Sequence, residues 1–227
     1  MARRQATSHK PPKLPKHRPG QAGGTRDLNR RDNLRRLHDD ALALFLAEGT
    51  AAVTIDQIVG AAGVAKGSFY RYVADKAELV GHIITPVASE ITQAIDRCAT
   101  ALRGARTETL AGIYLRLAIE LSTVIARHPS QVLLYLQEAR APASGPRAAI
   151  QTFANEVTAR AIELTEIARA HGLVRAVDPR VAALTVTGAI DALLFAYLRD
   201  RELPTAEIPA VTRELVAIVL GGIGARR

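Results

Sequence analysis

The sequence has few of the residues that form cross-links, metal clusters or aromatic cores: it contains one cysteine, no tryptophan and only 4% aromatic residues. The single cysteine, Cys98, excludes an internal disulfide and a cysteine-based metal cluster within one chain. No uninterrupted apolar run reaches the roughly eighteen residues that suggest a membrane-spanning helix. Arg3 and Arg4 are not followed by the apolar segment of an export signal. We therefore expect a cytoplasmic protein with no membrane partner.

Catalytic signatures are missing as well. The six histidines show no metal-ligand spacing, and the sequence has neither a Gly-x-Ser-x-Gly nucleophile elbow nor a phosphate-binding glycine loop. The neighbouring carboxylates Asp39 and Asp40, like Glu163 and Glu166, are most simply interpreted as solvated helix faces. We predict no catalytic residue, no cofactor and no bound metal, with a helical enzyme as a minor alternative.

Aliphatic residues at helical spacing dominate what is present. Hydrophobic residues make up 48% of the chain, mostly Ala, Leu, Val and Ile, and the glycines and prolines fall mainly between helical periods. No β-rich run with regular turn residues is visible. The pattern predicts an all-α protein, and 227 residues are enough for one or two domains with a sizeable core.

The positive charge is concentrated at the N-terminus. The formal net charge is +8, and residues 1–32 hold nine basic and two acidic residues, so they carry seven of those eight charges. Residues 1–31 are also rich in Pro and Gly and poor in large apolar residues. We expect a disordered basic arm there. Such an arm can follow a phosphate backbone or enter a minor groove, or it can be a solubilising tail, and both interpretations stay open.

A helix-turn-helix is predicted between Thr54 and Val73. Thr54 is a favoured N-cap, and Gln57, three residues later, completes a capping box. Gly63 stands where a left-handed residue would end this first short helix. In the second helix Phe69 and Val73, four residues apart, would face the core, which leaves a small, basic and aromatic face outward. A second helix of this kind can enter the major groove of DNA.

The order of residues around this element resembles the DNA-binding domain of the TetR/AcrR (tetracycline-repressor) family. The matching stretches, in order along the chain, are Ala41, Leu44-Phe45, Glu48-Gly49, Thr54 to Ile58, Ala62 to Val64, Lys66 to Tyr72 and Asp75 to Leu79. Three positions differ from the usual family pattern: Thr50, Ala65 and Val73. Of these, Ala65 removes an N-cap hydroxyl that could also contact phosphate.

The resemblance implies a domain organisation and a set of DNA contacts. It implies a three-helix helix-turn-helix DNA-binding domain at residues 32–78, followed at 79–227 by a helical ligand-binding and dimerisation domain. Ser68, Tyr70 and Arg71 are the candidates for base contacts, and Gly67 for close backbone approach. The candidates for phosphate contacts are Thr54, Lys66, Tyr72 and Lys76.

The second half of the chain carries the candidate effector site and dimer interface. In the family, helices between about Thr107 and Ala170 surround a ligand pocket, and the last two helices pair with their copies from a second subunit. Polar residues on apolar faces are the candidate ligand contacts: Tyr114, Glu120, Tyr135, Gln137, Glu138 and Asn155. The candidate interface residues are Leu184, Gly188, Ala192, Phe195, Leu215 and Val219.

The sequence therefore predicts a homodimeric, ligand-responsive transcriptional regulator, interpreted as a repressor that binds a palindromic operator in double-stranded DNA. The expected partners are that DNA, a second copy of the chain and a small apolar effector. Two alternatives stay open: a nonspecific architectural DNA-binding protein, and a helical small-molecule-binding protein or enzyme with a vestigial DNA-binding domain.

Overall fold

The computed structural model describes residues 25–200 and 208–223, and within these ranges the chain forms nine α-helices, two short 3₁₀ turns (η1 and η2) and no strand. The predicted all-α class is confirmed. The helices are α1 Thr25–Glu48, α2 Ile55–Ala61, α3 Lys66–Tyr72, α4 Lys76–Leu102, α5 Leu110–Arg127, α6 Pro129–Glu138, α7 Ala148–Ala170, α8 Pro179–Asp200 and α9 Ile208–Ile223, with η1 at Thr107–Thr109 and η2 at Gly145–Arg147.

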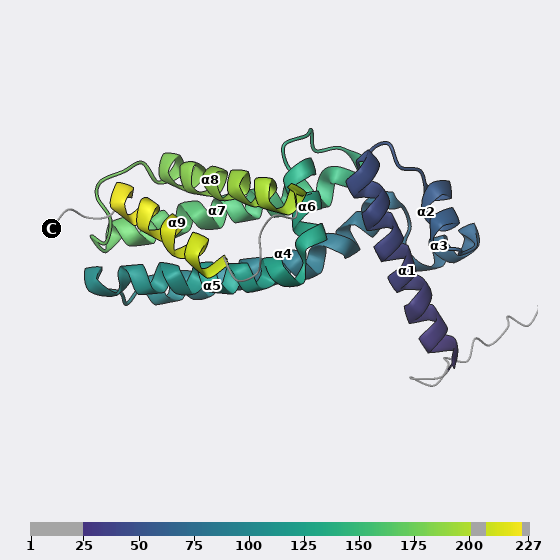
Figure 1. Cartoon of the computed structure of the whole chain (residues 1–227), viewed down its shortest axis with the longest axis horizontal. Coiled ribbons are helices and arrows are strands. Elements are labelled where there is room, and N and C mark those ends of the chain that lie inside the picture. The colour runs from purple at the N-terminus through teal and green to yellow at the C-terminus, as the bar shows by residue number, and fades with distance from the viewer. Residues whose placement is uncertain (1–24, 201–207, 224–227) are drawn as a thin grey trace, which may run out of the picture.

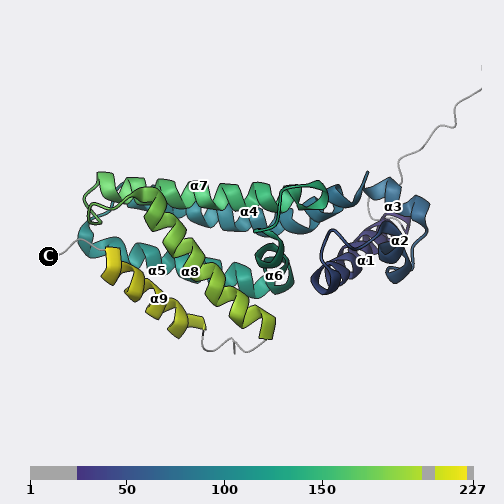
Figure 2. The same cartoon turned by 90° about the horizontal axis from the view of Figure 1, so that it is seen from above.

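The helices form an elongated molecule with α1–α3 at one end (Figure 1). The helix α4 begins beside them and continues into the other part of the chain, where it packs against α5 and α7. Helix α8 packs on α6 and α7, whereas α9 packs on α5. Figure 2 shows α4 and α7 side by side along one side of the molecule, with α9 on the other.

The first helix starts earlier than the sequence predicted. We expected it to begin near Asp32, but α1 begins at Thr25, so residues 25–31 of the predicted disordered arm are helical, and residues 1–24 lie outside the described residues. The physical reason is local, because no glycine or proline interrupts the chain from Thr25 to Glu48. The Asp32 carboxylate also pairs with Arg35 at 2.6 Å and with Arg36 at 2.9 Å, which are favourable helical spacings.

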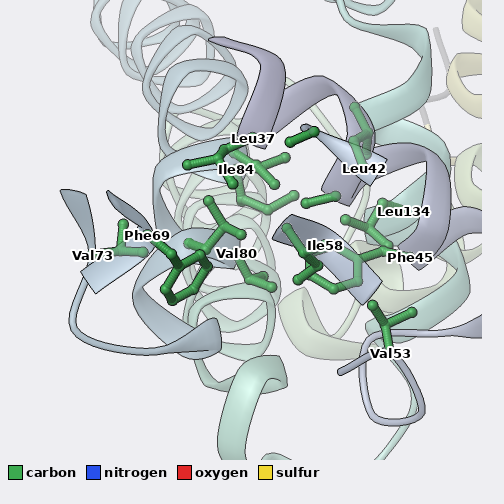
Figure 3. Packing of buried hydrophobic residues seen from close by; sticks show 14 of the residues in the cluster. Leu37, Leu42, Phe45, Val53, Ile58, Phe69, Val73, Val80, Ile84 and Leu134 are labelled. Atoms are coloured by element: carbon green, nitrogen blue, oxygen red, sulfur yellow. The ribbon is translucent and has the colours of Figure 1, made fainter. Parts of the chain in front are cut away.

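The helix-turn-helix shares one hydrophobic core with later helices. Phe45 of α1, Ile58 of α2 and Phe69 of α3 are fully buried, together with Val80 of α4 and Leu134 of α6. Figure 3 shows Phe45, Ile58 and Leu134 close together. The predicted boundary between residues 78 and 79 therefore falls inside α4, whose first turns complete the core around α1–α3.

Two helical segments are apolar and long enough to cross a membrane, judged by length and composition alone. They are Thr107–Arg127 and Pro179–Arg199, and 11% of the tested window in each is buried within the chain. Both segments agree with the sequence, which has no uninterrupted apolar run of that length, because Glu120 interrupts the first segment and Asp191 interrupts the second. Both segments also line the cavity described below, which gives their apolar residues a second explanation.

Candidate nucleic-acid interface and internal cavity

The first helix of the helix-turn-helix is fixed by the predicted capping box. The Thr54 hydroxyl accepts the Gln57 backbone N–H at 3.2 Å, and the Gln57 side-chain oxygen accepts the Thr54 backbone N–H at 2.7 Å. The Thr54 hydroxyl also lies 2.8 Å from that side-chain oxygen, to which it donates. Thr54 was predicted to contact phosphate, but in the structure its side chain forms hydrogen bonds within the cap.

The turn into α3 has the geometry that its glycine allows. Gly63 has φ of 62°, in the left-handed region, and the Val64 N–H donates to the Val59 carbonyl at 3.1 Å, closing the end of α2. Ala65 precedes α3 and provides no side-chain cap, as its missing hydroxyl predicted. Phe69 and Val73 are buried, so the opposite face of α3 turns toward solvent.

That outward face gathers most of the predicted DNA contacts. Lys66, Gly67, Tyr70 and Arg71 are exposed, and Tyr70 keeps 52% of its surface accessible. The Arg71 guanidinium donates to the half-buried Ser68 hydroxyl at 2.6 Å, which holds the two side chains together on this face. A flexible guanidinium beside a hydroxyl and an aromatic ring can form hydrogen bonds with base edges in a major groove.

The Lys66 ammonium has a local partner in α2. It lies 2.6 Å from the Asp56 carboxylate, and the hydrogen bond and charge of Asp56 raise the pKa of Lys66. The two side chains are 53% and 72% exposed, so solvent screens the pair. Lys66 can therefore exchange this partner for a phosphate.

Two predicted phosphate contacts are directed elsewhere. The Lys76 ammonium donates to the backbone carbonyls of Ala51, at 3.1 Å, and Val53 in the turn before α2. Burial, followed by the charge of Arg147, lowers the pKa of Lys76. Backbone carbonyls in a turn have no helical N–H partner, and Lys76 donates to these two. Tyr72 is half-buried against the hydrophobic core, so only part of its ring is available to DNA.

A cavity of about 310 Å³ lies among α4–α9. Its wall is mainly aliphatic, with Ile91 from α4, Leu117 from α5 and Leu136 from α6 as examples. The volume falls at the lower end of the range usual for small-molecule sites. The part of the chain that the structure describes contains no cluster of His, Cys, Asp and Glu side chains that could hold a metal ion. The aliphatic wall suits an organic, largely apolar ligand.

Two of the six candidate ligand residues line this cavity. Burial raises the pKa of the Tyr114 and Tyr135 hydroxyls, and the Tyr135 ring lies 5.0 Å from the Phe153 ring. Glu120 instead pairs with Arg97 at 2.8 Å on the outside of α5. Four candidates are not in the cavity wall: Glu120, Gln137, Glu138 and Asn155. The helical wheel alone could not separate these faces, because a polar residue on an apolar face can meet the cavity, another helix or solvent.

Glu138 is buried at the junction of the two halves of the chain. Its carboxylate accepts the Thr50 backbone N–H at 2.7 Å and a hydrogen bond from the Arg147 guanidinium. Burial on its own would raise the pKa of Glu138, but the hydrogen bonds from Arg147 and Thr50 outweigh it and lower the pKa. Glu138 thus ties the end of α6 to the turn between α1 and α2.

Sequence reasoning missed other polar residues of the cavity wall. They include Asp191, which follows Ile190 and precedes Ala192 in a strongly apolar helix. A single charge inside such a run was a usable signal, because charged residues are rarely buried without a function or a partner. The remaining missed polar lining residues are Ser122, Thr165, Thr187 and Tyr197.

The candidate interface residues divide between an exposed face and the cavity. On α8, Leu184 is 47% exposed and Ala192 is exposed, whereas Gly188 and Phe195 are half-buried. On α9, Leu215 and Val219 line the cavity, so they do not form the outermost face of that helix. Among the α9 side chains that the structure describes, Ile218 is a large apolar residue that keeps 66% of its surface accessible.

Comparison with known proteins gives consistent matches. Residues 37–83 match the family model for bacterial regulatory proteins of the tetR family. The HTH-type transcriptional repressor KstR2 of Mycobacterium tuberculosis is 31% identical over 111 residues, which cover 47% of this chain and 51% of that protein. The chain thus spans about half the length of the curated relatives it matches.

Solved structures reproduce the fold along most of the chain. The ketosteroid transcriptional regulator KstR2 of Mycobacterium tuberculosis superimposes with a TM-score of 0.62 and 23% identity, covering 85% of this chain and 96% of that one. SmeT, the repressor of the Stenotrophomonas maltophilia multidrug efflux pump SmeDEF, superimposes with a TM-score of 0.62 and 22% identity, covering 86% and 93%. At these identities the likeness establishes the fold.

Proposed function

We propose that this chain, which belongs to the TetR family of bacterial regulatory proteins, is a transcriptional repressor that binds a palindromic operator as a homodimer and releases it when a small apolar effector fills the cavity. The observation that carries the proposal is the combination, in one chain, of an exposed basic and aromatic α3 with an apolar cavity among α4–α9. The relatives are regulators, which supports a cytoplasmic role without catalysis, at the nucleoid when the protein is bound to DNA.

In this proposal the outward face of α3 reads the operator. Arg71 approaches a guanine through a bidentate pair, with Ser68 and Tyr70 beside it. Gly67 lets the helix backbone come close to the DNA, and Lys66 exchanges Asp56 for a phosphate. The body of the protein has little net charge outside the N-terminal arm, so binding depends on these few placed contacts.

A second copy of the chain supplies the other recognition helix. Two such helices reach successive major grooves when their centres are roughly 34–36 Å apart. The exposed apolar residues of α8 and α9, including Val181, Leu184 and Ile218, offer a surface for the pairing. Exposed apolar patches of this kind commonly mark interaction sites. The spacing of the two α3 helices then depends on how α8 and α9 hold the two subunits.

Helix α6 is the physical link between effector and DNA. It carries Tyr135 into the cavity wall, packs against α1, and ends at Glu138, which binds Thr50. An effector that shifts α6 therefore moves the turn that precedes α2. Coupling between two ligands in such systems is typically about 1–3 kcal/mol, and it is reciprocal, so operator DNA must weaken effector binding by the same factor.

The test begins with an operator identified by genome-wide footprinting of the full chain at physiological salt. Arg71→Ala is then compared with the unsubstituted chain by fluorescence anisotropy on operator and random duplexes at several salt concentrations. We expect the variant to lose most of its preference for the operator, about 1–3 kcal/mol for one bidentate base contact, while nonspecific, salt-dependent binding is retained.

Arg116→Ala on α5 is the matched control, because Arg116 is exposed and its loss changes the net charge equally, far from α3. It should leave operator preference intact. If Arg71→Ala prefers operator over random DNA as strongly as the unsubstituted chain does, Arg71 does not contact the bases that determine specificity. Salt-dependent binding without any preferred site, even in the unsubstituted chain, would favour the architectural alternative.

A further inference from the structure

The cavity wall contains a single charged side chain among its described residues, Asp191 of α8. The neighbouring wall is aliphatic, formed by residues such as Ile190 and Leu194 on the same helix and Leu136 on α6. A carboxylate in such surroundings is costly unless it is paired or neutralised. Asp191 therefore requires a partner that the apolar wall does not supply.

Within residues 25–200 and 208–223, the Asp191 carboxylate forms no hydrogen bond and no ion pair. Burial raises its pKa, and the nearby positive charge of Arg140, in the exposed turn after α6, acts in the opposite direction without reversing the shift. Tyr135, also in the cavity wall, lies close enough for the charge of Asp191 to contribute to the raised pKa of its hydroxyl. The carboxylate thus faces the cavity with unused acceptor capacity.

The hydroxyl groups of the wall do not supply the missing donor. Ser122 donates to the Ala118 carbonyl at 2.7 Å, Thr165 to the Ala161 carbonyl at 3.0 Å, and Thr187 to the Ala183 carbonyl at 2.9 Å. The Thr165 and Thr187 bonds lie within the hydroxyl's own helix, so the protons of both hydroxyls are already used. These two threonine protons are therefore not available to Asp191, and the tyrosine hydroxyls of the wall form no hydrogen bond with it among the described residues.

We propose that Asp191 binds a protonated amine on the effector, so that the effector is an apolar molecule with one ammonium group. The inference rests on the effector cavity of the proposed function and specifies its ligand. An ammonium group satisfies the carboxylate through charge-assisted hydrogen bonds, while the aliphatic wall covers the apolar remainder. A carboxylate-bearing ligand of the same size is disfavoured, because two like charges would share a small apolar space.

Three probes with the same apolar chain test the proposal: decylamine, decanol and decanoate, each titrated calorimetrically into the full chain at neutral pH. We expect decylamine to bind about 10- to 100-fold more tightly than decanol, the range of one charge-assisted hydrogen bond, and decanoate to bind most weakly. In Asp191→Asn the affinities for decylamine and decanol should become similar. Asp191→Glu should restore part of the preference for the amine.

Asp39→Asn, on α1, is the matched control, because it removes the same carboxylate charge from an exposed side chain outside the cavity wall. It should keep the decylamine preference. If Asp191→Asn still prefers decylamine, Asp191 does not bind the amine. The same conclusion follows if the unsubstituted chain shows no preference for decylamine although decanol binds and releases operator DNA. In both cases the proposed effector cavity is not contradicted. If none of the three probes binds, the effector cavity itself is contradicted, and the role of Asp191 with it.

Discussion

At the scale of single residues, Glu138 joins three segments that are far apart in the sequence. It is 5% exposed, ends α6, and accepts hydrogen bonds from Thr50 after α1 and from Arg147 before α7. Removing its charge leaves the Thr50 N–H and the guanidinium without an ionised acceptor. Buried groups that lose a partner in this way are expensive, whereas the formation of the same bond contributes only modestly.

We predict that Glu138→Gln lowers the free energy of unfolding by about 1–3 kcal/mol, measured by urea denaturation at neutral pH. Glu163→Gln is the matched control, because Glu163 pairs with Arg103 at 3.0 Å with both side chains about half exposed. An exposed pair of that kind contributes about 0–1 kcal/mol. Equal losses in the free energy of unfolding for the two variants would show that burial does not increase the contribution of the Glu138 hydrogen bonds.

The loss of unfolding free energy in Glu138→Gln should depend on pH in a defined direction. The hydrogen bonds hold the folded-state pKa of Glu138 below its ordinary value of 4.5, despite burial. The stabilisation is therefore fully present above that ordinary value and is lost as the pH falls through the lower folded-state pKa. The difference in unfolding free energy between the unsubstituted chain and Glu138→Gln should shrink on acidification. A difference that is unchanged by acidification contradicts this assignment.

At the scale of elements, Gly67 is a position where one substitution should raise the stability of the fold and lower its affinity for the operator. It lies on the exposed face of the helix, and a Cβ placed there meets nothing within 4 Å. Gly67→Ala should stabilise the fold by roughly 0.5–1 kcal/mol, because alanine loses less conformational freedom in a helix. The added methyl group also occupies the face that approaches DNA. We expect operator binding to weaken by about 1–3 kcal/mol, comparable to one mismatched base pair.

Gly112→Ala on α5 is the control for this prediction, because a Cβ there also meets nothing within 4 Å and the position is far from α3. It should give a similar gain in thermal stability and leave operator affinity unchanged in the anisotropy assay. If Gly67→Ala binds the operator as well as the unsubstituted chain does, the backbone at Gly67 does not approach the DNA closely.

Element ends could be predicted from the sequence because their chemistry is local. Thr54 and Gln57 cap α2 as expected, and Asp75 caps α4 by accepting the Glu78 N–H at 2.8 Å. Gly63 adopts the left-handed conformation that its position suggested. In each case the donor and the acceptor lie within a few residues of each other, so spacing alone identifies them.

Tertiary partners could not be predicted, because they depend on which helix faces meet. Lys76 was expected at phosphate but donates to the carbonyls of Ala51 and Val53, more than twenty residues earlier. Glu138 was expected at the ligand but binds Thr50, and Asp191 was not considered although it lines the cavity. A polar residue in an apolar helix indicates a buried partner, but the sequence does not say which one.

At the scale of the whole molecule, α8 and α9 carry large apolar residues that are exposed in the single chain. Leu184 and Ile218 keep 47% and 66% of their surfaces accessible, and Val181 keeps 63%. Figure 2 shows α9 on the side of the molecule away from α4 and α7, with α8 running obliquely from beside α7 toward that side. In the proposed dimer, burying these residues supplies the hydrophobic contribution to association.

We predict that the double variant Leu184→Glu with Ile218→Glu is a folded monomer. Both positions are exposed in the single chain, so the substitutions should change its own unfolding by only about 0.5 kcal/mol, whereas two buried, unpaired carboxylates per subunit would oppose pairing. Sedimentation velocity should show a dimer for the unsubstituted chain and a monomer for the variant. Operator affinity should fall, because one recognition helix contacts one half-site.

Ile119→Glu controls for the loss of an exposed apolar side chain, because Ile119 is 52% exposed and lies on α5 rather than on α8 or α9. It should stay dimeric and bind the operator normally. Decanol binding separates the two roles of this half of the chain: if the monomeric variant still binds decanol, the cavity forms within one chain and the dimer serves the spacing of α3. A double variant that stays dimeric places the interface on another face.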